Sequence, residues 1–90
     1  IFEVAYMTAL VQNDVFDQSI LYRDLGEVQK LYSENGWEEE AQLAGDVQVF
    51  LKKTNWKTQK AFFDYFAGLV NTRAFSCEKV RAYMQEEKND

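Results

Sequence analysis

The sequence predicts an all-α fold: a compact antiparallel bundle of four to five helices, forming a single domain over residues 1–90. Two observations lead to this prediction. The chain has no proline and only four glycines, whereas all-β domains need turn-forming residues about every 8–12 positions. Apolar residues also recur at helical spacing in several segments. With 47% hydrophobic and 16% aromatic residues, the 90-residue chain can form one core.

The first two predicted helices span about residues 2–12 and 15–33. The first is apolar on all sides, which is typical of a helix that is buried or covered by a partner. The second has a core-facing stripe with intervals of four, three and four residues, formed by Leu21, Leu25, Val28 and Tyr32. A second stripe lies on another side of this helix, interrupted by charged residues. Its members are Phe16, Ile20 and Leu31.

Glycines mark two features of the second predicted helix. Gly26 lies in its middle, where glycine costs about 1 kcal/mol relative to alanine, and is interpreted as a close helix crossing or a break. Asn35-Gly36 ends the helix, because glycine suits the left-handed position that follows a helix.

The third predicted helix spans about residues 37–53. Its first turn holds Glu38–Glu40 and its last turn Lys52-Lys53, the arrangement that the helix dipole favours. Thr54-Asn55 ends this helix and can cap the next one. The core-facing arc of the third helix comprises Trp37, Leu43, Ala44, Val47, Phe50 and Leu51.

The last two predicted helices span about residues 56–70 and 77–87. The first of them is the most aromatic segment of the chain, and each buried large side chain contributes about 1.5–3 kcal/mol, so we expect the other helices to pack around it. Its apolar arc comprises Trp56, Phe62, Phe63, Phe66, Leu69 and Val70. Ser76 is expected to cap the final helix, whose core face comprises Cys77, Val80, Tyr83 and Met84.

Composition excludes several chemistries. The chain has no histidine and a single cysteine, Cys77, so His-based catalysis, an internal disulfide and most zinc sites are excluded. Consecutive helical residues diverge by about 100°, so Glu38–Glu40 cannot converge on one ion. We therefore expect no catalytic residue, no metal and no cofactor, and hence no enzyme. Cys77 is expected to be packed in the core.

No segment has the length and apolarity of a transmembrane helix, and no leader sequence is visible, so we expect a cytoplasmic protein. The segment Gly36–Ala41, following Leu25, Val28 and Tyr32, resembles the turn inside a tetratricopeptide-type helical hairpin. The next window about 34 residues on does not repeat it. The sequence therefore predicts one hairpin and no repeat array.

Two features favour a non-catalytic protein–protein interaction module. One is the excess apolar surface of the first two helices, with a partner-binding face formed by Phe16, Ile20, Leu31, Asp24 and Glu27. The other is the charge distribution. Residues 1–46 hold ten acidic and two basic side chains, whereas residues 47–90 hold eight basic and five acidic ones. We expect the partner to be another protein or a second copy of the chain.

Two alternatives remain open. An acidic inhibitor, immunity or antitoxin-like protein would occupy a basic site on a target through Asp17, Asp24, Glu27, Glu34, Glu38 and Glu39. A nucleic-acid-binding regulator would contact phosphates through Lys52, Lys53, Lys57 and Lys60. The net charge of −5 and the break at Thr54-Asn55 make nucleic acid the less favoured partner.

Overall fold

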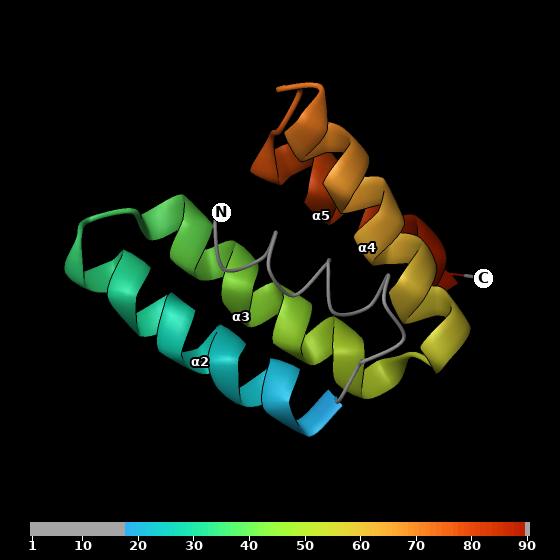
Figure 1. The fold of residues 1–90 in the computed structure, drawn as a ribbon, viewed down its shortest axis with the longest axis horizontal. Coiled ribbons are helices and arrows are strands. Elements are labelled where there is room, and N and C mark those ends of the chain that lie inside the picture. Colours follow the sequence, from blue (N-terminus) through green and yellow to red (C-terminus); the bar gives the residue numbers. More distant parts are fainter. Residues whose placement is uncertain (1–17, 90) are drawn as a thin grey trace.

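A computed structural model describes residues 18–89, and all regular structure in that range is helical (Figure 1). The four helices are α2 (Gln18–Glu34), α3 (Glu38–Lys53), α4 (Trp56–Asn71) and α5 (Cys77–Asn89). Over the described residues the predicted all-α class is therefore confirmed, and the end of α2 and both ends of α3, α4 and α5 lie within two residues of those expected. The expected helix over residues 2–12 and residues 15–17 of the expected second helix lie outside the described residues.

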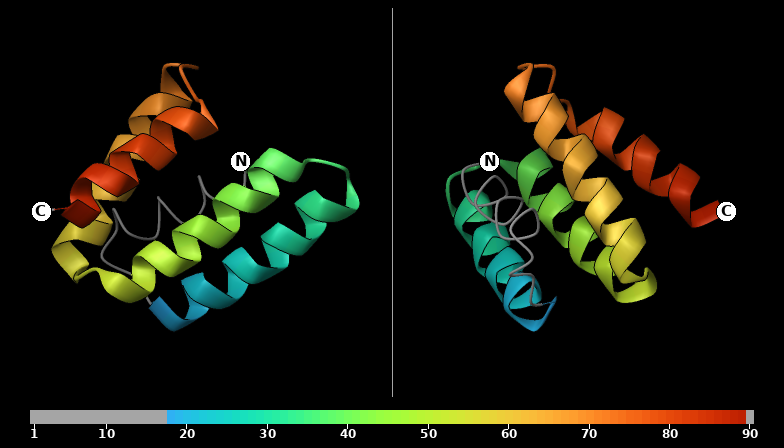
Figure 2. Two further views of the ribbon diagram at one scale, coloured as in Figure 1. Left: turned by 180° about the vertical axis from the view of Figure 1, so that it is seen from behind. Right: turned by 45° about the vertical axis from the view of Figure 1, so that its right-hand side comes forward.

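The described helices form two hairpins. α2 and α3 lie side by side and run antiparallel, and α4 and α5 form a second antiparallel pair (Figures 1 and 2). The two pairs are inclined to each other and meet at the short turn between α3 and α4. α5 packs against both α3 and α4.

The main core lies between the two hairpins and draws on all four helices. Phe62, Phe63 and Phe66 of α4 are almost completely buried. Neighbouring rings make aromatic contacts, with centroids 5.1 Å apart for Phe50 and Phe62. The predicted core-facing stripes of α2, α3 and α5 are buried as expected, except that Trp37 is exposed and Tyr83 is only partly buried. Their buried members are Leu21, Leu25, Val28, Tyr32, Leu43, Ala44, Val47, Phe50, Leu51, Cys77, Val80 and Met84.

A buried glutamine fixes the α3–α4 turn. The Gln59 side chain donates from Nε2 to the carbonyl oxygens of Leu51 (2.8 Å) and Thr54 (3.0 Å), which satisfies acceptors at the end of α3. Asn55 Oδ1 accepts from the backbone N–H of Thr58 at 3.0 Å, so the predicted cap of α4 is confirmed. The two helices are therefore separated by an ordered turn.

Gly26 lies at a helix crossing, one of the two interpretations offered by the sequence. A methyl group at Gly26 would lie 3.1 Å from Gln48 Nε2, and one at Gly45 would lie 2.7 Å from Gln29 Nε2. Gln48 Nε2 also donates to the backbone oxygen of Tyr22 at 2.7 Å. Small residues and amide side chains therefore hold α2 and α3 together on this side.

Both tryptophans depart from the prediction. Trp37 precedes α3 and Trp56 is the first residue of α4, and their side chains are 53% and 40% exposed. Their assignment to core-facing arcs was wrong because Trp37 lies outside α3, where the helical projection does not apply, and Trp56 lies at the very start of α4. The burial of a terminal side chain depends on how the chain enters the helix.

Candidate functional site

The partner-binding face predicted on α2 lies on the side of the helix away from α3. Ile20, Asp24, Glu27 and Leu31 follow one another at intervals of four, three and four residues, so they share one side. The residues of α2 that approach α3 are Tyr22, Gly26 and Gln29, on roughly the opposite side.

Exposure differs along this face. Ile20 is 42% and Leu31 49% exposed, and Glu27 is exposed between them. The Asp24 carboxylate is partly buried and lies 3.5 Å from the Arg23 guanidinium. Phe16 lies outside the described residues. The structure thus brings four of the five predicted residues to one side of α2, with both apolar ones accessible.

The turn after α2 fixes Trp37 in place. The N–H of Trp37 donates to the Tyr32 oxygen at 2.8 Å, and the N–H of Gly36 donates to the Ser33 oxygen at 3.1 Å. Gly36 has φ +77°. This is the Schellman arrangement of a helix end, with glycine in the left-handed position and an apolar residue after it. The Trp37 ring packs against Tyr32, with centroids 5.7 Å apart.

Trp37 is also the N-cap residue of α3, a position at which tryptophan offers no side-chain acceptor for the helix N–H groups. Its side chain makes no capping hydrogen bond. Serine or aspartate at an N-cap stabilises a helix by about 0.5–2 kcal/mol relative to a residue without a side-chain acceptor. A half-exposed tryptophan that forgoes this stabilisation is the kind of local conflict expected at a functional position.

Sequence reasoning missed Trp37 as a surface residue, although a signal was available. Gly36 was correctly predicted in the left-handed position, and the residue after that glycine commonly packs on the helix it ends. Placing Trp37 there, against Tyr32, would have removed it from the α3 core.

Acidic residues surround this end of the α2–α3 hairpin. Glu34, Glu38 and Glu39 are exposed, whereas Asp17 lies outside the described residues. Glu34 and Glu38 line a shallow depression of about 620 Å³ together with Lys30. Residues 34–40 include four glutamates, and Glu27 on α2 is a fifth. The basic residue nearest to them in sequence is Lys30. The hairpin end therefore presents apolar groups with negative charge around them.

The four lysines of the predicted basic strip do not form one continuous helical row. α3 ends at Lys53, Thr54 has extended backbone geometry, and α4 starts at Trp56. Lys52 Nζ lies over the Tyr22 ring, 4.9 Å from its centroid, whereas Lys53 faces α5. Lys57 is exposed on α4, and Lys60 is half-buried. This division weakens the case for a phosphate-binding strip.

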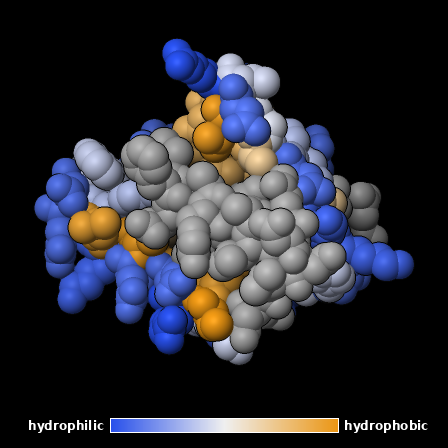
Figure 3. Space-filling view, viewed as in Figure 1, coloured by the Kyte–Doolittle hydropathy of each residue, from blue (hydrophilic) through white to orange (hydrophobic). Residues whose placement is uncertain are grey.

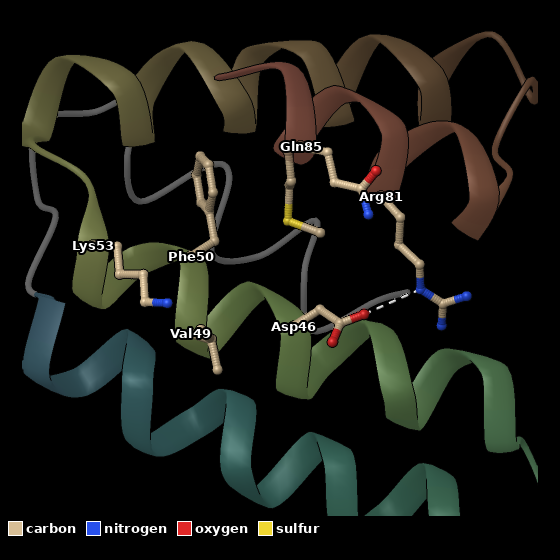
Figure 4. A pocket seen from close by; sticks show the side chains of 7 residues that line it. Asp46, Val49, Phe50, Lys53, Arg81 and Gln85 are labelled. Carbon is tan, nitrogen blue, oxygen red and sulfur yellow. Dashed lines mark hydrogen bonds and ion pairs between the residues drawn. The ribbon is translucent and has the colours of Figure 1, made fainter. Parts of the chain in front are cut away.

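A pocket of about 240 Å³ lies between α3 and α5 (Figure 4). Its lining comprises Asp46, Val49, Phe50, Lys53, Arg81, Met84 and Gln85. Arg81 Nε donates to Asp46 Oδ2 at 3.1 Å, and its terminal nitrogen donates to the Glu39 backbone oxygen at 3.0 Å. This ion pair joins α3 to α5 along one side of the pocket. Lys53 lies at the other end, and Val49 on the rim is 52% exposed.

Cys77 is packed in the core, as predicted. It is 4% exposed, and burial together with the nearby Glu39 and Glu40 carboxylates raises the pKa of the thiol to about 11. The thiolate is the reactive form of cysteine, so Cys77 is a poor nucleophile at neutral pH.

Within residues 18–89, no group of histidine, cysteine, aspartate or glutamate side chains is arranged to hold a metal ion. None of the described helices is long and apolar enough to cross a bilayer.

Over the described residues, the fold consists of two helical hairpins, and one end of the α2–α3 hairpin carries exposed apolar side chains beside acidic ones. Comparisons of the chain with protein-family models, with curated proteins and with solved structures gave no match.

Proposed function

We propose that the chain is a non-catalytic protein–protein interaction module whose binding surface is the outer side of α2 and the turn that follows it. The exposure of Leu31 and Trp37 at the same end of the hairpin carries this proposal. Grouped exposed apolar side chains are typical of interaction sites, and tryptophan is enriched among the residues that dominate binding energy. A cytoplasmic location and a protein partner, including a second copy, are part of the proposal.

The surface has the composition of a small interface. Apolar Leu31 and Ile20 flank the acidic Asp24 and Glu27. The face can therefore make apolar contacts and also favour a partner that carries basic groups. In the view of Figure 3, small hydrophobic areas are visible together with larger hydrophilic ones. The apolar and acidic residues that share this side of α2 suit recognition of a partner with apolar and basic groups.

Paired variants test this proposal. Ile20→Asp and Leu31→Asp each place a charge on the proposed face, and Ala61→Asp places the same charge on an exposed site of α4. We expect the first two to weaken partner binding or self-association at least about tenfold, while helical circular dichroism persists. Ala61→Asp should bind as the wild type does. If Ile20→Asp and Leu31→Asp both unfold the protein, the face is core and the proposal fails.

An acidic inhibitor, immunity or antitoxin-like role is the second candidate, favoured by exposed Glu34, Glu38 and Glu39. These carboxylates would occupy a basic site on a target. Screening of exposed charges predicts a steep loss of affinity between about 50 and 200 mM salt for this role. Affinity that is insensitive to salt would favour the apolar face instead.

A further inference from the structure

The exposed indole of Trp37 is held in a defined position before any partner arrives. The Schellman hydrogen bonds fix its backbone, and the contact with Tyr32 restricts its ring. A side chain that is already ordered loses little conformational entropy on binding, so Trp37 has the properties of a preorganised anchor.

The pocket between α3 and α5 has the chemistry that an indole requires. Phe50 and Met84 supply aromatic and thioether surface, and both groups pack favourably on aromatic rings. Lys53 lies at one end of the pocket (Figure 4), where its ammonium group can lie over an aromatic face. Its side chain has no ion pair among the described residues. The volume of about 240 Å³ suits one aromatic side chain and is small for a larger ligand.

The surroundings of the anchor and the pocket carry opposite charge. Glu34, Glu38 and Glu39 are exposed near Trp37. Exposed Lys53 lines the pocket, and exposed Lys52 and Lys57 lie at the same end of α3 and at the start of α4. A chain with one acidic and one basic end attracts its own copies head to tail.

We propose that the chain binds a second copy of itself by seating Trp37 of one copy in the α3–α5 pocket of the next. This inference rests on the proposed interaction function and names its partner. The glutamates beside Trp37 then face Lys53 and its neighbours across the contact.

The contact forms between copies, because within its own copy Trp37 packs against Tyr32 and not in the pocket. Trp37 precedes the first residue of α3, and the α3 residues of the pocket are Asp46–Lys53, so about 14–24 Å of helix separates them within one chain. A contact between two different surfaces is heterologous, so each bound copy leaves one anchor and one pocket open. Such association continues into a ring or an open chain.

Two variants separate the two halves of the contact. Trp37→Ser removes the anchor and supplies a favourable N-cap to α3, so the fold is retained. Val49→Glu/Lys53→Glu closes the pocket at two exposed positions and keeps Trp37. Lys79→Glu is the charge control, because Lys79 is exposed on α5 and does not line the pocket. Sedimentation velocity between about 1 µM and 1 mM covers weak association.

We expect the average mass of the wild-type protein to rise with concentration, and each half-contact variant to associate at least about tenfold more weakly. Lys79→Glu should change association less than about threefold. A mixture of the two half-contact variants should form a heterodimer that grows no further, because each variant supplies one half. A wild-type protein that stays monomeric at 1 mM, association unaffected by Trp37→Ser, or a mixture that does not pair would each overturn the inference. Binding of a different protein that Leu31→Asp weakens would leave the proposed function standing in any of these cases.

Discussion

Replacing Gln59 tests the account of how the central helix is fixed. Gln59 is 2% exposed, and its Nε2 atom donates to two carbonyl oxygens at the end of α3. Gln59→Met keeps nearly the same volume and removes both hydrogen bonds. The Leu51 oxygen then loses this donor inside the core, and the Thr54 oxygen loses it at a partly buried position.

The expected cost follows from these two contacts. Each hydrogen bond contributes about 0.5–1.5 kcal/mol net, and leaving a buried acceptor without a donor costs about 1–3 kcal/mol. For two hydrogen bonds we therefore expect Gln59→Met to lower the free energy of unfolding by about 1–3 kcal/mol. For a domain of this size the melting temperature falls by about 4–8 °C per kcal/mol. Gln48→Met is the control, because the half-buried Gln48 amide makes one hydrogen bond to Tyr22, and its loss should cost about 1 kcal/mol.

Urea unfolding monitored by circular dichroism measures both variants. A loss below about 1 kcal/mol for Gln59→Met would refute the role assigned to this side chain. Gln59→Glu adds a pH test, because an ionised carboxylate would face two carbonyl oxygens in the core. The pKa of that carboxyl should be raised in the folded state, so the folded variant binds more protons than the unfolded one. Its stability relative to the wild type should then fall from pH 4 to pH 7; a constant difference would contradict this reasoning.

Three further predictions concern helix ends, an exposed glycine and the thiol. Gly36→Ala should lower the stability by about 1 kcal/mol, because Gly36 has φ +77°. Arg73→Gly should raise it by up to about 1 kcal/mol, because Arg73 has φ +57° at the equivalent position after α4. Thermal melts measure both variants, and effects of the same sign and size would exclude a backbone cause. Gly68→Ala should stabilise α4 by about 0.5–1 kcal/mol, since nothing lies within 4 Å of the added methyl group, and destabilisation in urea melts would reveal a contact there. Cys77 should react slowly with iodoacetamide in the native protein and rapidly in urea. Since its pKa is raised to about 11 in the folded state, the stability that it contributes is complete below about pH 9 and is lost as the pH rises through 11; a pH-independent stability between 9 and 11 would contradict the raised pKa.

The sequence was sufficient to predict the helices and most of the core because both depend on local periodicity. In α5, Cys77, Val80 and Met84 recur at intervals of three and four, and all three are buried. Asn55 caps α4 through a contact three residues away, which is equally local. Such features can be predicted without knowing how the helices pack.

Features that depend on distant segments could not be predicted. The Arg81–Asp46 ion pair joins positions 35 residues apart, and the pocket beside it exists only once α5 lies against α3. Gln59 is polar by type and becomes buried because the end of α3 supplies two acceptors. The exposure of Leu31 agrees with its predicted place outside the core stripe, whereas the exposure of Trp37 was missed.

The central claim is that this domain binds protein through the α2 side and its turn. A pull-down with the tagged chain from source lysate, with and without nuclease and read by mass spectrometry, tests the claim most directly when Leu31→Asp serves as a second bait. We predict a protein partner, or further copies of the chain, that survives nuclease and is depleted on the Leu31→Asp bait. Recovery that depends on nucleic acid, or equal recovery on both baits, would contradict the account.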